Sequence, residues 1–325
     1  MGRRNSGGAA LLFASGMAAI SNALLAVLAS RDHIVAHHTL FGQTLQLLDH
    51  LTSAFGVEVT YVDATDPKNV SAALRPSTRV LYLETPTNPV IDILDIEALA
   101  ALGHAAGALV FADTTFAGPL VQQPLALGAD LSMQSASKSL AGHADVLAGC
   151  VAGSAALIAR IRRMRTLTGP ILDPHASWLL MRGLQTLPLR VRAQSETASR
   201  VADRLAASRV VSLLRYPLHQ SHPGYAVARK QMRCGGSMVS FAFVGGLEHT
   251  RAFVNALAWI PLASSLGSVF TTLEVLDELD FSVSEIGARA TSFAMPPAFI
   301  RLSVGAESGD DVLADIERGL AAVGD

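Results

Sequence analysis

The chain has 325 residues, of which half are hydrophobic and 16% are charged, with a formal net charge of −2. This charge balance gives no electrostatic reason to expect binding to nucleic acid or to an anionic membrane. The two cysteines, Cys150 and Cys234, exclude a disulfide framework, have no metal-ligand spacing and suit a reducing compartment. The length is enough for a large core and predicts two domains.

The first apolar stretch runs from Ala9 to Ser30 without a charge. Its length could cross a bilayer or direct secretion, and the first residues fit a loose myristoylation pattern. Small and polar residues inside it, among them Ser15, Gly16 and Asn22, favour the first buried helix of a large domain. We therefore expect no membrane insertion.

Strand-like and helix-like segments then alternate along the first half of the chain. The intervening stretches are rich in alanine and leucine, and one of them ends at Gly107, a typical helix stop. Such alternation predicts a mostly parallel sheet with helices on both faces, in which ligands gather at the carboxyl ends of the strands. The apolar runs that predict strands are 33–38, 57–62, 79–84, 108–113, 130–135 and 146–153.

The pattern changes after Pro174. Residues 174–208 predict long helical sequence interrupted near Pro188. A strand-like segment at 237–246, a helix around 248–258 and another strand at 299–305 before a final helix predict a smaller α+β domain. We place the two domains at 1–188 and 189–325. The basic run Arg160–Arg165 is interpreted as a solvated helix face rather than a polyanion site.

Lys138 lies among small residues and hydroxyls, directly after a predicted buried strand. It could be an ordinary solvent-exposed loop lysine. It could also form a Schiff base with a carbonyl compound, which requires a partly desolvated amine with a lowered pKa. Hydroxyls at Ser135 and Ser137 could bind an anion beside it.

Two further stretches favour the Schiff-base interpretation. Asp113 ends an apolar strand, where it could cap a turn or helix, or could pair with the protonated nitrogen of a pyridine ring. Gly16 follows strand-like sequence at the start of a helix, where backbone N–H groups can approach a phosphate. A phosphate cradle, a carboxylate and a lysine thus follow one another along the chain, each at a strand end.

With these residues assembled, the chain resembles the Cys/Met-metabolism enzymes that use pyridoxal phosphate (PLP), such as cystathionine γ-synthase, the cystathionine lyases and methionine γ-lyase. The resemblance implies an α/β fold of fold type I, with a large, mostly parallel cofactor domain and a smaller C-terminal α+β domain. The motifs that carry it, in chain order, are ASGMAAI, TLFGQT, LETPTNP, FADTTFAGP, SASKSLAGHADVLAG, MRGLQTLPLR, SSLG and RLSVGAE.

The resemblance also implies a role for particular residues. Lys138 would form the Schiff base with the cofactor and move protons, and Asp113 would hold the ring nitrogen. Arg301, with Ser265, would bind the substrate carboxylate, for which a forked guanidinium is suited. The other implied cofactor contacts are the amides of Gly16 and Met17, the hydroxyls of Ser135 and Ser137, the side chain of Asn88 and the ring of Phe41.

Three features depart from the family pattern. Phe41 stands where the family usually has tyrosine, and its ring can stack but cannot transfer a proton. An N-terminal arm with a Tyr-x-Arg motif is not found before the first cofactor motif, so a different start, a truncation or a partner chain would account for it. The segment SLGSVFTTLEVLDELDF, beginning at Ser265, diverges where the substrate pocket is shaped.

We therefore expect a cytoplasmic PLP enzyme that catalyses β- or γ-elimination or γ-replacement on a sulfur-containing or O-acylated amino acid. The alternative is a catalytically weakened homologue that binds the cofactor or serves in a mixed oligomer. The expected partners are a small amino-acid substrate and other subunits, either in a homo-oligomeric dimer or tetramer or with an arm-bearing homologue. Neither nucleic acid, a membrane nor a metal ion is expected.

Overall fold

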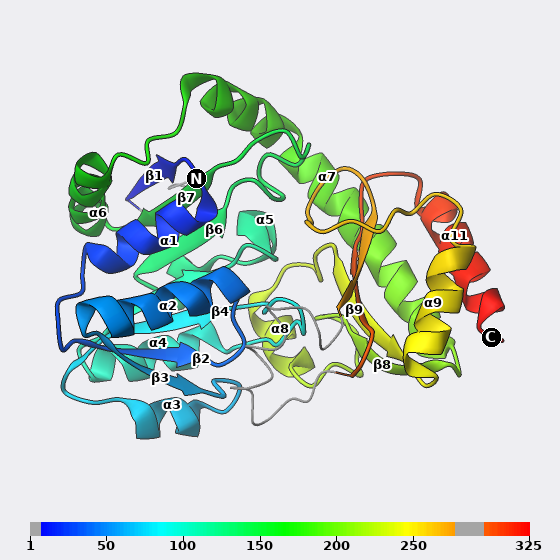
Figure 1. Cartoon of the computed structure of the whole chain (residues 1–325), viewed down its shortest axis with the longest axis horizontal. Helices are drawn as coiled ribbons and strands as arrows, with labels where there is room; N and C mark the ends of the chain where they lie inside the picture. The colour runs from blue at the N-terminus through cyan, green and yellow to red at the C-terminus, as the bar shows by residue number, and fades with distance from the viewer. Residues whose placement is uncertain (1–7, 277–295) are drawn as a thin grey trace.

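The computed structural model describes residues 8–276 and 296–325, which form a seven-stranded sheet and a four-stranded sheet (Figure 1). The strand order of the larger sheet is β1-β7-β6-β5-β4-β2-β3. Strand β7 runs antiparallel to both neighbours, and the other pairs are parallel, so the predicted mostly parallel sheet is confirmed. Its strands are β1 (Ala9–Phe13), β2 (His33–His37), β3 (Glu58–Val62), β4 (Thr78–Glu84), β5 (Leu109–Asp113), β6 (Leu131–Ser135) and β7 (Gly149–Gly153).

Helices cover both faces of this sheet, because successive side chains of each strand point to opposite sides. In β2, Ile34 and Ala36 belong to one hydrophobic cluster, whereas Val35 belongs to another on the opposite face. Arg160, Arg162 and Arg163 of the basic run are exposed on their helix, as predicted, whereas Arg165 is partly buried and donates to the Leu12 carbonyl at 2.8 Å. The first face carries α1 (Gly16–Leu25), α2 (Gly42–Phe55) and α6 (Ala155–Thr168), and the second carries α3 (Pro67–Ala73) and α4 (Ile96–Ala105).

The apolar stretch Ala9–Ser30 is not one helix. Its first part is β1, which pairs antiparallel with β7 at the sheet edge, and the helix begins only at Gly16. Ser15 ends the extended segment and caps α1, since its hydroxyl accepts the Ala18 N–H at 3.0 Å. The buried part of the prediction is confirmed for α1, where Ile20 and Leu24 are in the core. Among the described residues, no helix has both the length and the apolar character needed to cross a membrane.

A single long helix, α7 (Pro174–Ala207), leads from the larger sheet to the smaller one (Figure 1). The predicted interruption near Pro188 is wrong, because the helix continues through this residue. Pro188 is exposed, while Leu187 and Arg190 are buried on the packed side and hold the helix in place. A proline inside a helix leaves one carbonyl without its N–H partner, and its ring here lies on the exposed side of the helix. The domain boundary at residue 188 falls inside α7 and stays a prediction.

The smaller sheet is antiparallel, with strand order β10-β11-β9-β8. One face packs on the second half of α7 and on α9 (Gly246–Ala256) and α11 (Gly309–Ala322) through an apolar cluster that includes Phe241 and Phe253. The predicted strands at 237–246 and 299–305 and both helices are confirmed. The strands are β8 (Val211–Arg215), β9 (Met238–Phe243), β10 (Thr272–Leu276) and β11 (Phe299–Ser303), of which β8 and β10 were not predicted.

The two sheets meet near the loop that follows β4. In β9, the Ser240 hydroxyl donates to the Pro89 carbonyl at 2.9 Å, and Ser240 is fully buried. Ser240 is also the register partner of Arg301 on β11. The smaller sheet therefore presents Arg301 to the carboxyl end of the larger sheet. The end of the divergent SLGSVFTTLEVLDELDF segment, residues 277–281, lies outside the described residues.

Candidate functional site

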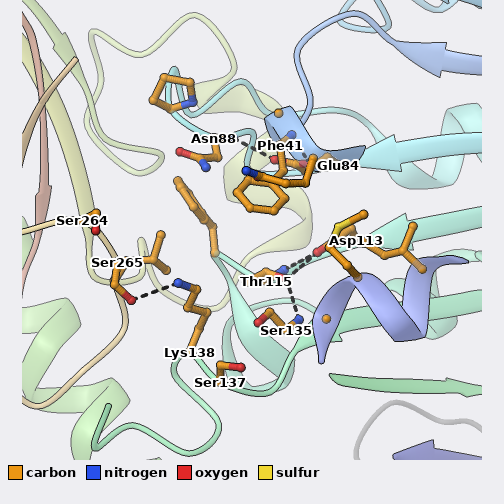
Figure 2. Close-up of a pocket in the computed structure, with 18 of the residues that line it drawn as sticks. Phe41, Glu84, Asn88, Asp113, Thr115, Ser135, Ser137, Lys138, Ser264 and Ser265 are labelled. Carbon is orange, nitrogen blue, oxygen red and sulfur yellow. Dashed lines mark hydrogen bonds between the residues drawn. The ribbon is translucent and has the colours of Figure 1, made fainter. Parts of the chain in front are cut away.

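A cavity of about 600 Å³ lies at the carboxyl ends of β4, β5 and β6, where the two sheets meet (Figure 2). Every site residue predicted from the sequence lines it, although these residues come from segments far apart in the chain. They are Gly16, Met17, Phe41, Asn88, Asp113, Ser135, Ser137, Lys138, Ser265 and Arg301. The roles that the resemblance gives to these residues remain predictions.

Asp113 is the last residue of β5 and is only 6% exposed. The hydroxyl and the N–H of Thr115 both donate to its Oδ1, at 2.6 and 2.9 Å. Burial raises the pKa of Asp113 to about 6, while the two Thr115 hydrogen bonds oppose this shift. No ion pair joins Asp113 to a cation within residues 8–276 and 296–325. A protonated ring nitrogen would supply the missing opposite charge.

Glu84 is a second buried carboxyl group beside Asp113. It ends β4 and is the register partner of Asp113 in the parallel β4–β5 pair. Burial and then the Asp113 charge raise the pKa of Glu84 to about 8. Its two oxygens accept the N–H groups of Phe41 at 2.9 Å and Asn88 at 3.0 Å. Glu84 therefore fixes two predicted cofactor-contact residues to the sheet edge.

The N-terminus of α1 forms a cradle suited to an anion. The capping bond of Ser15 engages Ala18, and a helix offers no internal partner to the amides of its first turn. Gly16 and Met17 line the cavity, so the partial positive charge of this helix end lies beside it. A Cβ on Gly16 would lie 3.0 Å from Cβ and 3.1 Å from Oγ of Ser135, so this glycine keeps the Ser135 hydroxyl close to the helix end.

The two predicted phosphate-binding hydroxyls differ in their surroundings. The Ser135 N–H donates to Thr115 Oγ1 at 2.9 Å, which connects this residue to the Asp113 group. The Ser137 hydroxyl is engaged with Ala148, since it accepts the Ala148 N–H at 2.9 Å and donates to the Ala148 carbonyl at 3.2 Å. To bind a phosphate, the Ser137 hydroxyl would have to donate its hydrogen bond to a phosphate oxygen instead of the Ala148 carbonyl.

Lys138 lies in the loop after β6 and is half-buried, so the interpretation as a solvent-exposed loop lysine is wrong. Its Nζ donates to the Ser265 hydroxyl at 3.0 Å, and the two side chains point toward one another in Figure 2. Burial, followed by the Arg301 charge, lowers the pKa of Lys138, and the Glu274 charge opposes this. A lowered pKa increases the fraction of neutral amine that can act as a nucleophile or accept a proton.

The loop that carries Ser265 is held tightly against the lysine loop. Ser265 has a φ of +99°, a conformation that non-glycine residues rarely adopt and that is concentrated at functional sites. Gly267 has a φ of +75°, and a Cβ there would lie 2.7 Å from the Ser139 nitrogen. The close approach of the two loops therefore depends on a glycine at this position.

Arg301 lies on β11 with only 6% exposure. Its Nη1 donates to Asn88 Oδ1 at 2.6 Å, and its Nη2 donates to the Ser265 carbonyl at 3.4 Å and to Glu274 Oε2. Asn88 thus contacts both Glu84, through its backbone, and Arg301, through its side chain. The same network joins the carboxyl-rich sheet edge to the guanidinium.

Phe41 lies between β2 and α2, lines the cavity wall, and is 41% exposed as a residue. In Figure 2 Phe41 lies above Asp113 and Ser135, on the side of Asn88 and Glu84. A ring in this place can stack on a flat ligand, but it brings no hydroxyl to the site.

A second cluster, His37, His38 and Asp63, was not predicted and lies outside this cavity. Three potential ligand groups come together there at the ends of β2 and β3. However, Nδ1 of His37 accepts the Ala64 N–H at 3.1 Å, which places the His37 proton on Nε2, 3.7 Å from Asp92. This tautomer leaves His37 no lone pair for a metal ion, so we interpret the cluster as structural.

Sequence reasoning missed three residues of the site, namely Glu84, Thr115 and Glu274. Glu84 and Thr115 stood inside the quoted motifs LETPTNP and FADTTFAGP, and each lies at or just after a predicted strand end, the same signal that identified Asp113. Glu274 stands in an unpredicted strand, and no sequence signal pairs it with Arg301.

The comparisons with known proteins agree with this site. The sequence profile described as Cys/Met metabolism PLP-dependent enzyme matches residues 2–321. L-methionine gamma-lyase of Fusobacterium nucleatum is 39% identical over 320 residues, which cover 98% of this chain and 81% of that protein. Cystathionine beta-lyase of Lactococcus lactis is 38% identical over 309 residues, covering 95% of this chain and 80% of that protein.

The solved structures lead to the same family. Cystathionine gamma-lyase from Lactobacillus plantarum, complexed with L-serine, superposes with a TM-score of 0.91 at 38% identity and covers 99% of this chain and 84% of that chain. This match confirms the expected fold type I architecture, with its mostly parallel sheet and smaller C-terminal sheet. The chain belongs to the Cys/Met metabolism family of PLP-dependent enzymes.

Proposed function

We propose that this protein binds pyridoxal phosphate in the described cavity and catalyses β- or γ-elimination, or γ-replacement, on a sulfur-containing or O-acylated amino acid. The observation that carries the proposal is the convergence of an amine, a buried carboxyl group, an anion cradle and a guanidinium on one cavity. The named reactions of the relatives, a methionine gamma-lyase and two cystathionine lyases, support this reaction class.

The residues of the cavity fit the cofactor at three points. The α1 amides and the Ser135 hydroxyl would hold the phosphate, Asp113 would pair with the ring nitrogen, and Lys138 would bond to the aldehyde carbon. When bound, pyridoxal phosphate supplies an electron-withdrawing ring that stabilises negative charge on the substrate. Asp113, with no cationic partner of its own in the described part of the chain, would keep that ring nitrogen protonated.

The remaining steps belong to the side chains of the protein. Arg301 would orient the substrate carboxylate, which sets the α-hydrogen toward Lys138. The neutral form of Lys138 would remove that proton and later return a proton to the product. The Ser265 hydroxyl, 3.0 Å from Nζ, would hold the Lys138 side chain in place whenever the lysine is not bonded to the cofactor.

Absorbance spectra test the cofactor site. The protein mixed with pyridoxal phosphate should develop a visible band, which Lys138→Ala should abolish. Lys68→Ala, which removes an exposed lysine from α3, is the matched control and should keep the band. Methionine, cystathionine, cysteine and O-acylhomoserines would then be screened for keto-acid and thiol release. A cofactor-loaded protein that turns over none of them would exclude the proposed reaction.

A second candidate function is supported by Phe41. Because this residue brings no hydroxyl to the cavity, the protein could bind the cofactor without efficient turnover and serve as one subunit of a mixed oligomer. Affinity purification from the native cells distinguishes the two candidates. A homologous second chain recovered at fixed stoichiometry supports the mixed oligomer, whereas an active oligomer of this chain alone excludes it.

A homo-oligomer is part of the first proposal. Trp178, Met181 and Leu189 are exposed. Met181 follows Trp178 by three positions and Leu189 follows it by eleven, so the three side chains share one face of α7. A second copy of the chain would cover this apolar face, and light scattering after size exclusion would give its stoichiometry. A cytoplasmic location is also proposed, supported by two cysteines that are not joined to one another.

A further inference from the structure

Glu274 faces the residue that is proposed to bind the substrate carboxylate. Strands β10 and β11 are antiparallel, and Glu274 is the direct register partner of Arg301. Directly opposite residues of such a pair point to the same face with their Cβ atoms about 5 Å apart. Both side chains line the cavity, so their contact lies inside the proposed substrate site and not on the outer surface.

The guanidinium of Arg301 is already engaged by groups of this chain. Nη2 donates to Glu274 and to the Ser265 carbonyl, and Nη1 donates to the Asn88 side chain. A carboxylate ligand needs two parallel N–H donors for the strong, forked contact. An incoming substrate carboxylate that used Nη2 as one of its two donors would therefore compete with Glu274 for that nitrogen.

The charges of the pair also offset one another within the cavity. The Arg301 charge lowers the pKa of Lys138 and the Glu274 charge raises it, so the two charges act in opposite directions on the lysine. A neutralised guanidinium attracts an anion less than a free one. Glu274 has a side-chain exposure of 22%, compared with 6% for Arg301. If a substrate displaced one partner of the pair, water could therefore solvate the Glu274 carboxylate more readily than the Arg301 guanidinium.

We propose that Glu274 is a specificity-determining residue that reduces selection for a free α-carboxylate, so that the site accepts amino-acid derivatives with a neutral carboxyl group, such as amides, alongside the free acids. This inference rests on the proposed function, because it assigns the substrate class of the same cavity. An amide brings no charge that competes with Glu274, and its oxygen can accept a single hydrogen bond from the Arg301 group. Glu274 itself takes no part in bond breaking.

Calorimetric binding of two probes tests the inference without turnover. The probes are (methylthio)butanoate, which is methionine without its amino group, and the corresponding primary amide. Neither has an amine, so neither can react with the cofactor. The protein loaded with pyridoxal phosphate should bind the acid and the amide with dissociation constants within about threefold of each other. Glu274→Gln should lower the dissociation constant of the acid by about tenfold, which is the effect of one recovered charge-assisted hydrogen bond. The dissociation constant of the amide should not change.

Two further variants complete the design. Glu274→Ala should also lower the dissociation constant of the acid, because it frees Arg301 without leaving a new polar side chain beside it. Glu58→Gln is the matched control, since it removes an acid from the exposed Arg75–Glu58 pair outside the cavity and should change neither constant. Thermal melts of each variant establish that the fold is retained.

The remaining outcomes overturn the inference. A loaded native protein that prefers the acid to the amide by more than about tenfold would show that Arg301 is available in spite of Glu274. Weaker acid binding in both Glu274 variants would show that Glu274 only positions Arg301, and no binding of either probe would exclude this substrate class. In each of these cases the Lys138-dependent visible band still decides the proposed function separately.

Discussion

Glu84 and Asp113 lie side by side at the carboxyl ends of β4 and β5, as register partners with buried carboxyl groups. Burial raises the pKa of both groups, and the Asp113 charge raises that of Glu84 further. Two adjacent carboxyl groups in a buried site resist simultaneous ionisation. The sheet edge therefore has an electrostatic cost at neutral pH that a cationic ligand group beside Asp113 would relieve.

The first prediction is that the stability of the cofactor-free protein decreases as the pH rises through this pair. Both folded pKa values, about 6 and about 8, lie above those of the unfolded chain. The stabilising contribution is thus fully present below about pH 4 and is lost as the pH rises through the folded values. In the native protein the free energy of unfolding should fall between about pH 5 and pH 9, and in Glu84→Gln this fall should be about 2–4 kcal/mol smaller. Urea unfolding at pH 5, 7 and 9 measures both values.

The control for this pH dependence is Glu58→Gln, which changes an exposed acid and should keep the native slope. A native-like slope in Glu84→Gln would contradict the assignment of the pH dependence to Glu84.

The second prediction concerns the affinity for pyridoxal phosphate. Asp113→Asn keeps an oxygen that can accept the Thr115 hydrogen bonds but loses the negative charge. Cofactor affinity should fall by about 100-fold, because a buried ring cation would lose its partner. Titration of the cofactor-free protein, followed by the visible band, measures the change. Asp66→Asn is the control, since asparagine also caps α3 at this exposed position. Equal affinity in the native protein and Asp113→Asn would remove Asp113 from the cofactor site.

Much of the fold could be predicted from the sequence because its signal is local. Five-residue strands rich in apolar residues, such as Leu109–Asp113, alternate with helices that have clear start and stop residues, such as α4, which Asp95 caps. Residues at the strand ends therefore identified Asp113 and Lys138 before their contacts were known. The break at Pro188 was wrong because proline disrupts a helix less on an exposed face, and burial is not visible in the local sequence.

The rest of the site depends on contacts between distant segments. Glu84 accepts N–H groups from Phe41 and Asn88, and its charge interacts with Asp113 on the next strand. Glu274 meets Arg301 only because β10 and β11 pair in one particular register. Sequence patterns indicate strands but do not fix such register, so neither interaction could be predicted.

The third prediction is that Arg190 positions the lysine loop. Arg190 is 5% exposed on α7, and its guanidinium donates to the Ser139 carbonyl at 2.7 Å and to the Leu140 carbonyl at 3.4 Å. Arg190→Ala should lower the free energy of unfolding by about 3 kcal/mol, because buried carbonyl groups lose their donors. It should also weaken the Lys138-dependent visible band, a readout that a remote structural change would not move.

Two variants make the Arg190 test specific. Arg190→Lys keeps the charge but cannot reach several carbonyl groups at once, so it should show an intermediate band. Arg192→Ala changes an exposed arginine two residues further along α7 and should alter neither measurement. A stable Arg190→Ala protein with a native band would contradict the positioning role.

The fourth prediction concerns the missing hydroxyl at Phe41. The backbone of this residue is fixed by Glu84 and its ring lies in the cavity wall, so Phe41→Tyr should add a hydroxyl to the site without moving the loop. A positioned proton donor is worth about 100-fold or more in rate, so kcat for thiol release from methionine or cystathionine should rise by about 10- to 100-fold. Phe270→Tyr, at an exposed residue outside the cavity, is the control. An unchanged kcat in Phe41→Tyr would show that another group already supplies the proton, and Lys138 is the residue in this cavity with the lowered pKa for that role.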